Sequence, residues 1–117
     1  MNRRVVVTGI GIICAVGNTV DEVWPALLSG KSGVERITSF DASAFACKIA
    51  AEVKNFDPLQ LIDKKEARKM ARFIHLAIAA SDEALRMANY KVENEEMAER
   101  TGVNIGSGIG EIGRAHV

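Results

Sequence analysis

The sequence contains little cysteine and has no excess of either charge. Its two cysteines, Cys14 and Cys47, exclude a disulfide framework, and no C-x-x-C pair or paired histidines indicate a zinc site. Fifteen basic residues balance fifteen acidic ones, so no overall field draws nucleic acid or an anionic membrane. We therefore expect no metal site, no nucleic-acid or membrane partner, and a reducing, cytoplasmic compartment.

Long hydrophobic runs are also missing. The apolar stretch over residues 5–16 follows a basic start, as in a secretory signal, but it is too short to span a bilayer. Gly9 and Gly11 interrupt it, and a strand followed by a turn explains the pattern equally well. Consecutive valines predict that residues 3–8 form this strand, with both faces covered.

Alternating patterns along the rest of the chain indicate an α/β domain. A helix is predicted to begin at Thr19, which forms a capping box with Glu22, and to end at Gly30. Its buried face is expected to consist of Val23, Trp24, Leu27 and Leu28. Further along, we predict a strand at 47–54, a short turn or helix from Asp57, a helix at 64–89, an exposed helix at 93–99 and a strand at 101–107. This order favours a mostly parallel sheet.

The helix predicted over 64–89 has one basic and one apolar face. The basic residues recur at i, i+3, i+4 and i+7: Lys65, Arg68, Lys69 and Arg72. Met70, Phe73, Ile74 and Ala77 have the same spacing on the other side, and residues 73–80 are apolar almost all round. The basic face is either simply solvated or a docking patch for an acidic partner. Because cations are unfavourable at a helix amino terminus, folding alone does not explain them, which favours docking.

Two glycine clusters and three reactive side chains have competing interpretations. The first cluster, residues 9–14, matches G-x-G-x-x-G in part, and the second, residues 108–113, matches it fully. No helix with a ribose-binding acid follows residues 108–113 in this sequence. Close backbone approach is the favoured alternative to nucleotide binding. Cys14 and Cys47 are expected to be small buried hydrophobes rather than nucleophiles, and His75 a hydrogen-bonded core residue rather than a ligand.

Several of these segments together resemble a known family. The residues that carry the likeness are 3–11, 16–18, Trp24 with 27–30, 32–34, 40–41, 64–66 with 68–70, and 106–110. In collinear order they are similar to the amino-terminal portion of the β-ketoacyl-[acyl-carrier-protein] synthase II family. The resemblance implies an α/β, partial thiolase-like fold, the first part of a layered α/β/α/β/α sandwich. Residues 1–117 would then be a truncated part of the amino-terminal domain.

The resemblance also implies an activity. The family consists of acyltransferases that elongate fatty acids by condensing an acyl thioester with malonyl-acyl carrier protein, usually as homodimers. Their catalytic cysteine, two histidines and lysine lie beyond Val117, so no catalytic residue is assigned in this chain. No separate cofactor is implied, because the substrates are carried on the phosphopantetheine of acyl carrier protein.

Two functional features carry over to this sequence. Lys65, Arg68 and Lys69 match the basic patch that docks the carrier protein, and Ile109 matches a residue that lines the acyl-chain pocket. Ala15 replaces a usual proline and Glu111 a usual glycine, and residues 114–117 leave the family pattern. A non-catalytic carrier-binding or dimerisation module is the main alternative, and a nucleotide-binding α/β domain is a weaker one.

Overall fold

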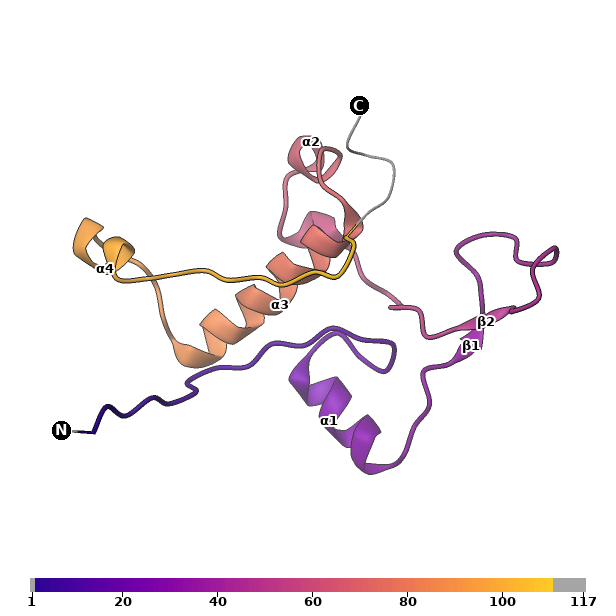
Figure 1. The fold of residues 1–117 in the computed structure, drawn as a ribbon, viewed down its shortest axis with the longest axis horizontal. Coiled ribbons are helices and arrows are strands. Elements are labelled where there is room, and N and C mark those ends of the chain that lie inside the picture. The colour runs from indigo at the N-terminus through magenta and orange to yellow at the C-terminus, as the bar shows by residue number, and fades with distance from the viewer. Residues whose placement is uncertain (1, 111–117) are drawn as a thin grey trace. The chain divides into compact units, whose positions relative to one another are not determined.

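A computed structural model describes residues 2–110 of the chain (Figure 1). In chain order the elements are α1 (Val20–Leu28), β1 (Glu35–Arg36), β2 (Ile49–Ala50), the 3₁₀ helix η1 (Pro58–Gln60), α2 (Lys64–Ala67), α3 (Arg72–Ala88) and α4 (Glu95–Glu99). The chain divides into two units. We call Gly11–Asp57 the central unit, and the described residues before and after it the helical unit.

The predicted capping box begins α1 in the central unit. The Thr19 hydroxyl accepts a hydrogen bond from the Glu22 N–H at 3.2 Å, and the Glu22 carboxylate accepts one from the Asn18 N–H at 2.8 Å. The returning bond therefore reaches one residue further back than in the usual box. The helix ends before Gly30, whose φ of 70° lies in the left-handed region that favours glycine. Both predicted ends are confirmed.

The buried face of α1 is narrower than the sequence predicts. Val23 is buried, as expected, and Ala26 is buried beside it one turn on. Trp24, Leu27 and Leu28 are more than half exposed, so the prediction is wrong for these three. Within the described residues, only the small face formed by i and i+3 positions is covered.

The sheet also differs from the prediction. In the described part of the chain, β1 and β2 form an antiparallel pair, with Glu35 opposite Ala50 and Arg36 opposite Ile49. The strand predicted over 47–54 is thus reduced to two residues. The segments 3–8 and 101–107 run without a ladder, and the described residues contain no mostly parallel sheet.

The unpaired segments have a common physical cause. A central strand is stabilised by neighbouring strands and by layers on both faces, and the described residues supply neither to 3–8 or 101–107. Val5 is accordingly 93% exposed and Val103 84% exposed.

The helical unit contains two helices where one was predicted. α2 ends in tight i→i+3 bonds, from Lys69 N–H to the Glu66 carbonyl and from Met70 N–H to the Ala67 carbonyl. Ala71 is extended, with φ −71° and ψ 156°, and α3 begins after it. The break falls between residues 68 and 71 and separates Arg72 from the basic residues before it.

α3 is the longest helix of the unit and is only half covered. Its residues 74–84 are partly exposed and none is fully buried, so the near-complete burial predicted over 73–80 is not present among the described residues. The buried residues of this unit lie instead around α2: Ile62, Ala67 and Ala71. α4 confirms the short exposed helix predicted at 93–99, and η1 confirms the short helix after Asp57. No helix among residues 2–110 is both long and apolar enough to cross a bilayer.

Candidate functional site

The turn around α2 carries a group of exposed basic residues in the helical unit. Asp63 begins it, because its carboxylate accepts a hydrogen bond from the Lys65 N–H at 3.0 Å. Ala67 buries the opposite side of the helix. The Nε2 of His75, on α3, lies 2.9 Å from the Ala67 carbonyl oxygen and fastens the end of α2 to α3. The turn is therefore held by a cap, by a buried residue and by a hydrogen bond.

His75 fits the interpretation made from the sequence. It is half-buried and hydrogen-bonded to a backbone carbonyl. Among residues 2–110, no group of three His, Cys, Asp or Glu side chains is placed to hold a metal ion.

Four exposed cations lie in and directly after α2: Lys64, Lys65, Arg68 and Lys69. Lys65, Arg68 and Lys69 are all exposed and lie within five consecutive residues of one turn. Lys69 Nζ forms an ion pair with Glu66 Oε1 at 3.0 Å. In the described part of the chain, the side chains of Lys65 and Arg68 form no ion pair. The predicted fourth member, Arg72, belongs to α3, beyond the break. We refer to Lys65, Arg68 and Lys69 as the basic turn.

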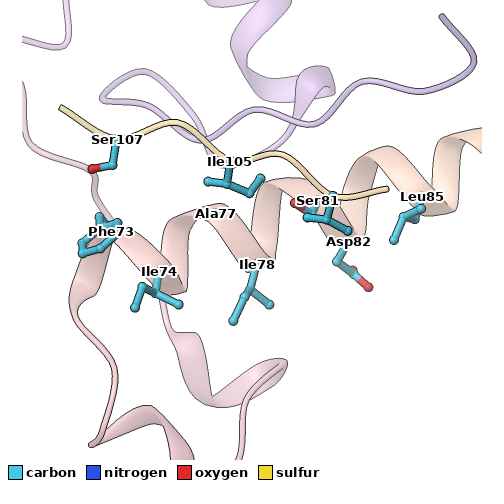
Figure 2. Close-up of a pocket in the computed structure, with 10 residues that line it drawn as sticks. Phe73, Ile74, Ala77, Ile78, Ser81, Asp82, Leu85, Ile105 and Ser107 are labelled. Carbon is cyan, nitrogen blue, oxygen red and sulfur yellow. The ribbon is translucent and has the colours of Figure 1, made fainter. Parts of the chain in front are cut away.

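An apolar groove runs along α3 in the same unit (Figure 2). It has a volume of about 580 Å³. Its lining comes from α3 and from the segment that follows α4: Phe73, Ile74, Ala77, Ile78, Ser81, Asp82, Leu85, Val103, Ile105 and Ser107. Figure 2 shows Ile105 and Ser107 on the strand-like segment that passes over α3. The groove is suited to apolar polypeptide or to an acyl chain, because apolar side chains predominate.

Ile109 lies beside this groove in the sequence but not in its lining. Its side chain is 80% exposed. The next residue, Gly110, has a φ of 75°, and a Cβ there would lie 3.0 Å from Phe73 Cε1. Residues 111–113 of the second glycine cluster, and the departures at Glu111 and 114–117, lie outside the described residues.

Gly9, in the first glycine cluster, provides close backbone approach. A Cβ on Gly9 would lie 2.0 Å from the Ala84 carbonyl oxygen and 2.9 Å from the Ala88 nitrogen. The neighbouring Ile10 N–H donates to Met87 Sδ at 3.4 Å. The favoured interpretation is confirmed at Gly9, which lets the amino-terminal segment touch the backbone of α3.

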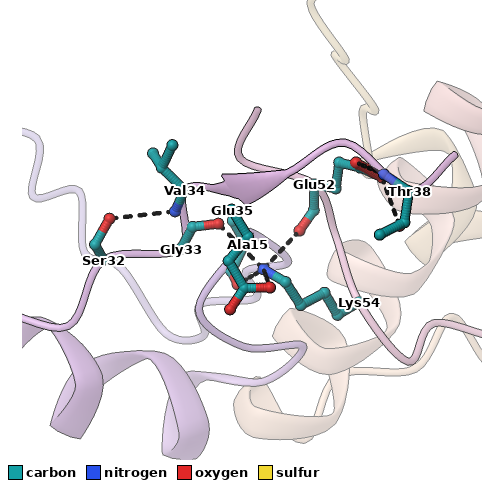
Figure 3. Close-up of polar contacts among 8 residues, drawn as sticks. All are labelled: Ala15, Ser32, Gly33, Val34, Glu35, Thr38, Glu52 and Lys54. Carbon is teal, nitrogen blue, oxygen red and sulfur yellow. Dashed lines mark hydrogen bonds and ion pairs between the residues drawn. The ribbon is translucent and has the colours of Figure 1, made fainter. Parts of the chain in front are cut away.

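A polar cluster that the sequence analysis missed organises the central unit (Figure 3). Lys54 Nζ donates to the carbonyl oxygens of Gly33 at 3.1 Å, Ala15 at 3.3 Å and Glu52 at 3.4 Å, and Glu35 lies 3.9 Å away. Lys54 was only one polar position of an alternating strand in the sequence. Nothing in that pattern indicates that its ammonium group would join three separate backbone segments.

The two cysteines differ in environment. Cys14 is half-buried in a tight turn, where its N–H donates to the Gly17 carbonyl at 2.9 Å. Cys47 is exposed, and its thiol donates to the Ile49 carbonyl at 3.4 Å. The prediction that Cys47 is buried is therefore wrong, since the strand that was expected to begin with Cys47 begins only at Ile49.

Comparison with known proteins gives a consistent result. The family model described as "Beta-ketoacyl synthase, N-terminal domain" matches residues 2–116. The 3-oxoacyl-[acyl-carrier-protein] synthase 2 of Synechocystis sp. is 48% identical over 108 residues, and that of Vibrio cholerae is 53% identical over 108 residues. Each alignment covers 92% of this chain and 26% of the relative. The chain thus spans about a quarter of the length of these relatives.

A solved structure extends the likeness to three dimensions. The ishigamide ketosynthase/chain length factor aligns with a TM-score of 0.71 and 36% identity, over 78% of this chain and 23% of that one. The fold is therefore a part of the thiolase-like α/β fold, although its described sheet has only two strands. On the family model and these relatives together, the chain belongs to the β-ketoacyl synthase family, and its match lies in the N-terminal domain of that family.

Proposed function

We propose that this chain is the amino-terminal segment of a 3-oxoacyl-[acyl-carrier-protein] synthase and that its basic turn docks acyl carrier protein. The observation that carries the docking proposal is the exposure of Lys65, Arg68 and Lys69 on a turn that is fixed from behind. The relatives named for acyl carrier protein support the choice of partner.

The basic turn is preorganised for docking. Because Asp63 caps the turn and His75 holds its end, the cations are presented without the entropy cost of ordering a loop. Positive charges on such a surface steer an acidic partner and fix its register more than they add affinity. An acidic carrier that must bind and leave in every cycle is the kind of partner that such a surface suits.

The reaction itself is assigned to polypeptide outside these 117 residues. In the proposed cycle, an acyl group moves from the carrier's phosphopantetheine thiol to a cysteine thiolate of the enzyme. Malonyl carrier protein then loses carbon dioxide, and the resulting carbanion attacks the acyl thioester. The chain described here contributes recognition of the carrier and needs no cofactor of its own. The proposal includes a homodimeric whole protein that works in the cytoplasm.

Ile109 is proposed to border the acyl-chain pocket. Its support is its place next to Gly110, which approaches the Phe73 ring at the groove. If so, Ile109→Phe in the natural protein shortens the acyl chains that are accepted, whereas Ile109→Val changes the profile little. An unaltered chain-length profile in the phenylalanine variant would remove this assignment.

Charge reversal tests the docking proposal. In the natural protein, K65E/R68E/K69E is expected to weaken binding of acyl carrier protein about tenfold or more at low salt. The matched control K31E/K91E/R100E makes the same change in net charge at exposed positions elsewhere. Equal affinities for the two triple variants, measured by calorimetry at low salt, would contradict docking at the basic turn.

The intact mass of the natural protein separates the enzyme from the non-catalytic alternative. A mass well above the 12.6 kDa of this chain supports the enzyme, whose catalytic residues then lie in the remaining polypeptide. A mass near 12.6 kDa, together with carrier binding but no condensation, would replace it by a carrier-binding module.

A further inference from the structure

Two acidic side chains, Asp63 and Glu66, lie next to the cations of the basic turn and make different contacts. The Asp63 carboxylate accepts the Lys65 N–H and is part of the helix cap. The Glu66 carboxylate pairs with Lys69 Nζ at 3.0 Å, and in the described part of the chain it makes no hydrogen bond to the backbone. Asp63 is thus needed to form the turn, whereas Glu66 is not.

The pair between Glu66 and Lys69 lies in solvent. The Lys69 side chain is 61% exposed and the Glu66 side chain 51% exposed. An exposed pair at i, i+3 contributes little to folding and opens at little cost. A carboxylate from outside the chain can therefore take the place of Glu66 at the Lys69 ammonium group.

Glu66 also lies close to the other cations of α2 and its end. Lys64 and Lys65 precede it, and Arg68 follows it by two residues. One and two residues correspond to a rise of about 1.5 and 3 Å along a helix axis. Charges so close in the chain are little screened in physiological salt, where the screening length is about 8 Å, so the charge of Glu66 reduces the attraction that these cations exert.

We propose that Glu66 competes intramolecularly with the acidic partner for Lys69. In the free protein the Glu66 carboxylate forms an ion pair with the Lys69 ammonium group. Docking replaces this internal ion pair by one between Lys69 and a carboxylate of the partner. Lys65 and Arg68 make the first contacts, and Glu66 limits the affinity of the docked state. This inference rests on the docking function proposed above.

The test is Glu66→Gln in the natural protein, with binding of acyl carrier protein measured at low salt. Glutamine keeps the shape and helix propensity of glutamate and leaves the Asp63 cap in place. We expect binding about two- to threefold tighter than wild type, since an exposed ion pair of this type is removed from the free state. The gain should shrink as salt is added.

Two further variants make the result specific. Glu99→Gln on α4 removes the same charge away from the basic turn and is expected to change the affinity much less. In a Lys69→Gln background, Glu66→Gln should improve the affinity for acyl carrier protein much less, because the ammonium group for which Glu66 and the partner compete has been removed.

The outcomes separate this inference from the docking function. If wild type binds, the triple reversal weakens binding, and Glu66→Gln tightens it no more than Glu99→Gln, the competition is wrong and docking stands. A gain that persists undiminished in the Lys69→Gln background would overturn it equally. No binding by wild type overturns both proposals.

Discussion

The Nε2 atom of His75 lies 2.9 Å from the carbonyl oxygen of Ala67 and so joins the first turn of α3 to the last residue of α2. The same carbonyl accepts the Met70 N–H at 3.2 Å. A carbonyl oxygen has two lone pairs, and these two donors use both. The imidazole thereby closes the end of a four-residue helix that would otherwise have only its cap and one buried residue to hold it.

Replacing His75 by leucine should loosen the basic turn. Loss of one hydrogen bond of this kind lowers the free energy of unfolding by about 0.5–1.5 kcal/mol. We also expect weaker binding of acyl carrier protein, because Lys65 and Arg68 lose their fixed positions. Chemical denaturation and calorimetry of the natural protein measure the two effects.

Glutamine at position 75 is the matched control. Its amide nitrogen reaches about as far as the Nε2 of histidine and can donate to the Ala67 carbonyl. His75→Gln should therefore recover most of the affinity and stability that His75→Leu loses. If the two variants behave alike, ring packing rather than the hydrogen bond holds α2.

Lys54→Met should destabilise the central unit. The Lys54 ammonium group donates to the carbonyls of Ala15, Gly33 and Glu52, and methionine keeps the apolar stem while it removes all three bonds. Because the lysine side chain is 37% exposed, water compensates in part, and we expect a loss of about 1–2 kcal/mol in the free energy of unfolding.

Lys31→Met provides the comparison for Lys54. Lys31 lines the same polar pocket as Lys54, is exposed, and loses the same charge on substitution. The free energy of unfolding of the Lys31→Met variant should stay within about 0.5 kcal/mol of the wild-type value. Equal losses in the two variants would attribute the effect to net charge rather than to the carbonyl contacts.

The sequence predicts best those features that depend on neighbouring residues. The Thr19 cap, the stop at Gly30 and the short helices after Asp57 and near Glu95 all follow from local side-chain and backbone bonds. The hydrogen-bonded role of His75 was predicted as well, although not its partner.

Features that depend on distant residues were predicted less well. Val5 and Val103 have the composition of central strands, but strand formation needs neighbouring strands that residues 2–110 do not provide. Phe73, Ile74 and Ala77 of the predicted apolar face line the groove along α3, whereas Met70 precedes that helix. How deeply this face is buried depends on what covers it. The contacts of the Lys54 ammonium group were not predicted. Two of its three carbonyl partners lie 21 and 39 residues away in the sequence, and only the third is near, at 2 residues.

Gly9→Ala should disrupt the contact between the amino-terminal segment and α3. A Cβ at 2.0 Å from the Ala84 carbonyl oxygen is far inside van der Waals contact, and the obstacle is backbone of a helix that cannot move locally. We expect the free energy of unfolding of the natural protein to fall by about 2 kcal/mol or more, or the soluble yield to collapse.

Gly102→Ala is the control for this substitution. A Cβ on Gly102 meets nothing within 4 Å among the described residues, so alanine there should be tolerated. A Gly9→Ala variant as stable as Gly102→Ala, measured by thermal melting, would show that the segment does not press against α3.

The Glu52 carboxylate, just after β2, holds the loop that follows β1 and makes its stability depend on pH. The backbone N–H of Thr38 donates to Glu52 Oε1 at 2.7 Å, and this bond is the chief reason why the pKa of Glu52 lies below its ordinary value. A lowered carboxyl pKa means that the folded state prefers the ionised form. The stabilisation is present above the ordinary glutamate pKa of about 4.3 and is lost as the pH falls through the lowered folded pKa.

Carboxyl NMR titration of the natural protein should detect this directly. In wild type, the chemical shift of the Glu52 carboxyl carbon should titrate at lower pH than that of an unpaired glutamate. The chemical shift of the Thr38 amide proton should follow the same titration. Thr38→Val removes the hydroxyl, which donates to Glu52 Oε2 at 3.3 Å, but keeps the N–H. Since the N–H is the larger cause, the pKa of Glu52 should remain lowered in this variant. An ordinary pKa for Glu52 in wild type would mean that the bond between the Thr38 N–H and the Glu52 carboxylate is not populated in solution.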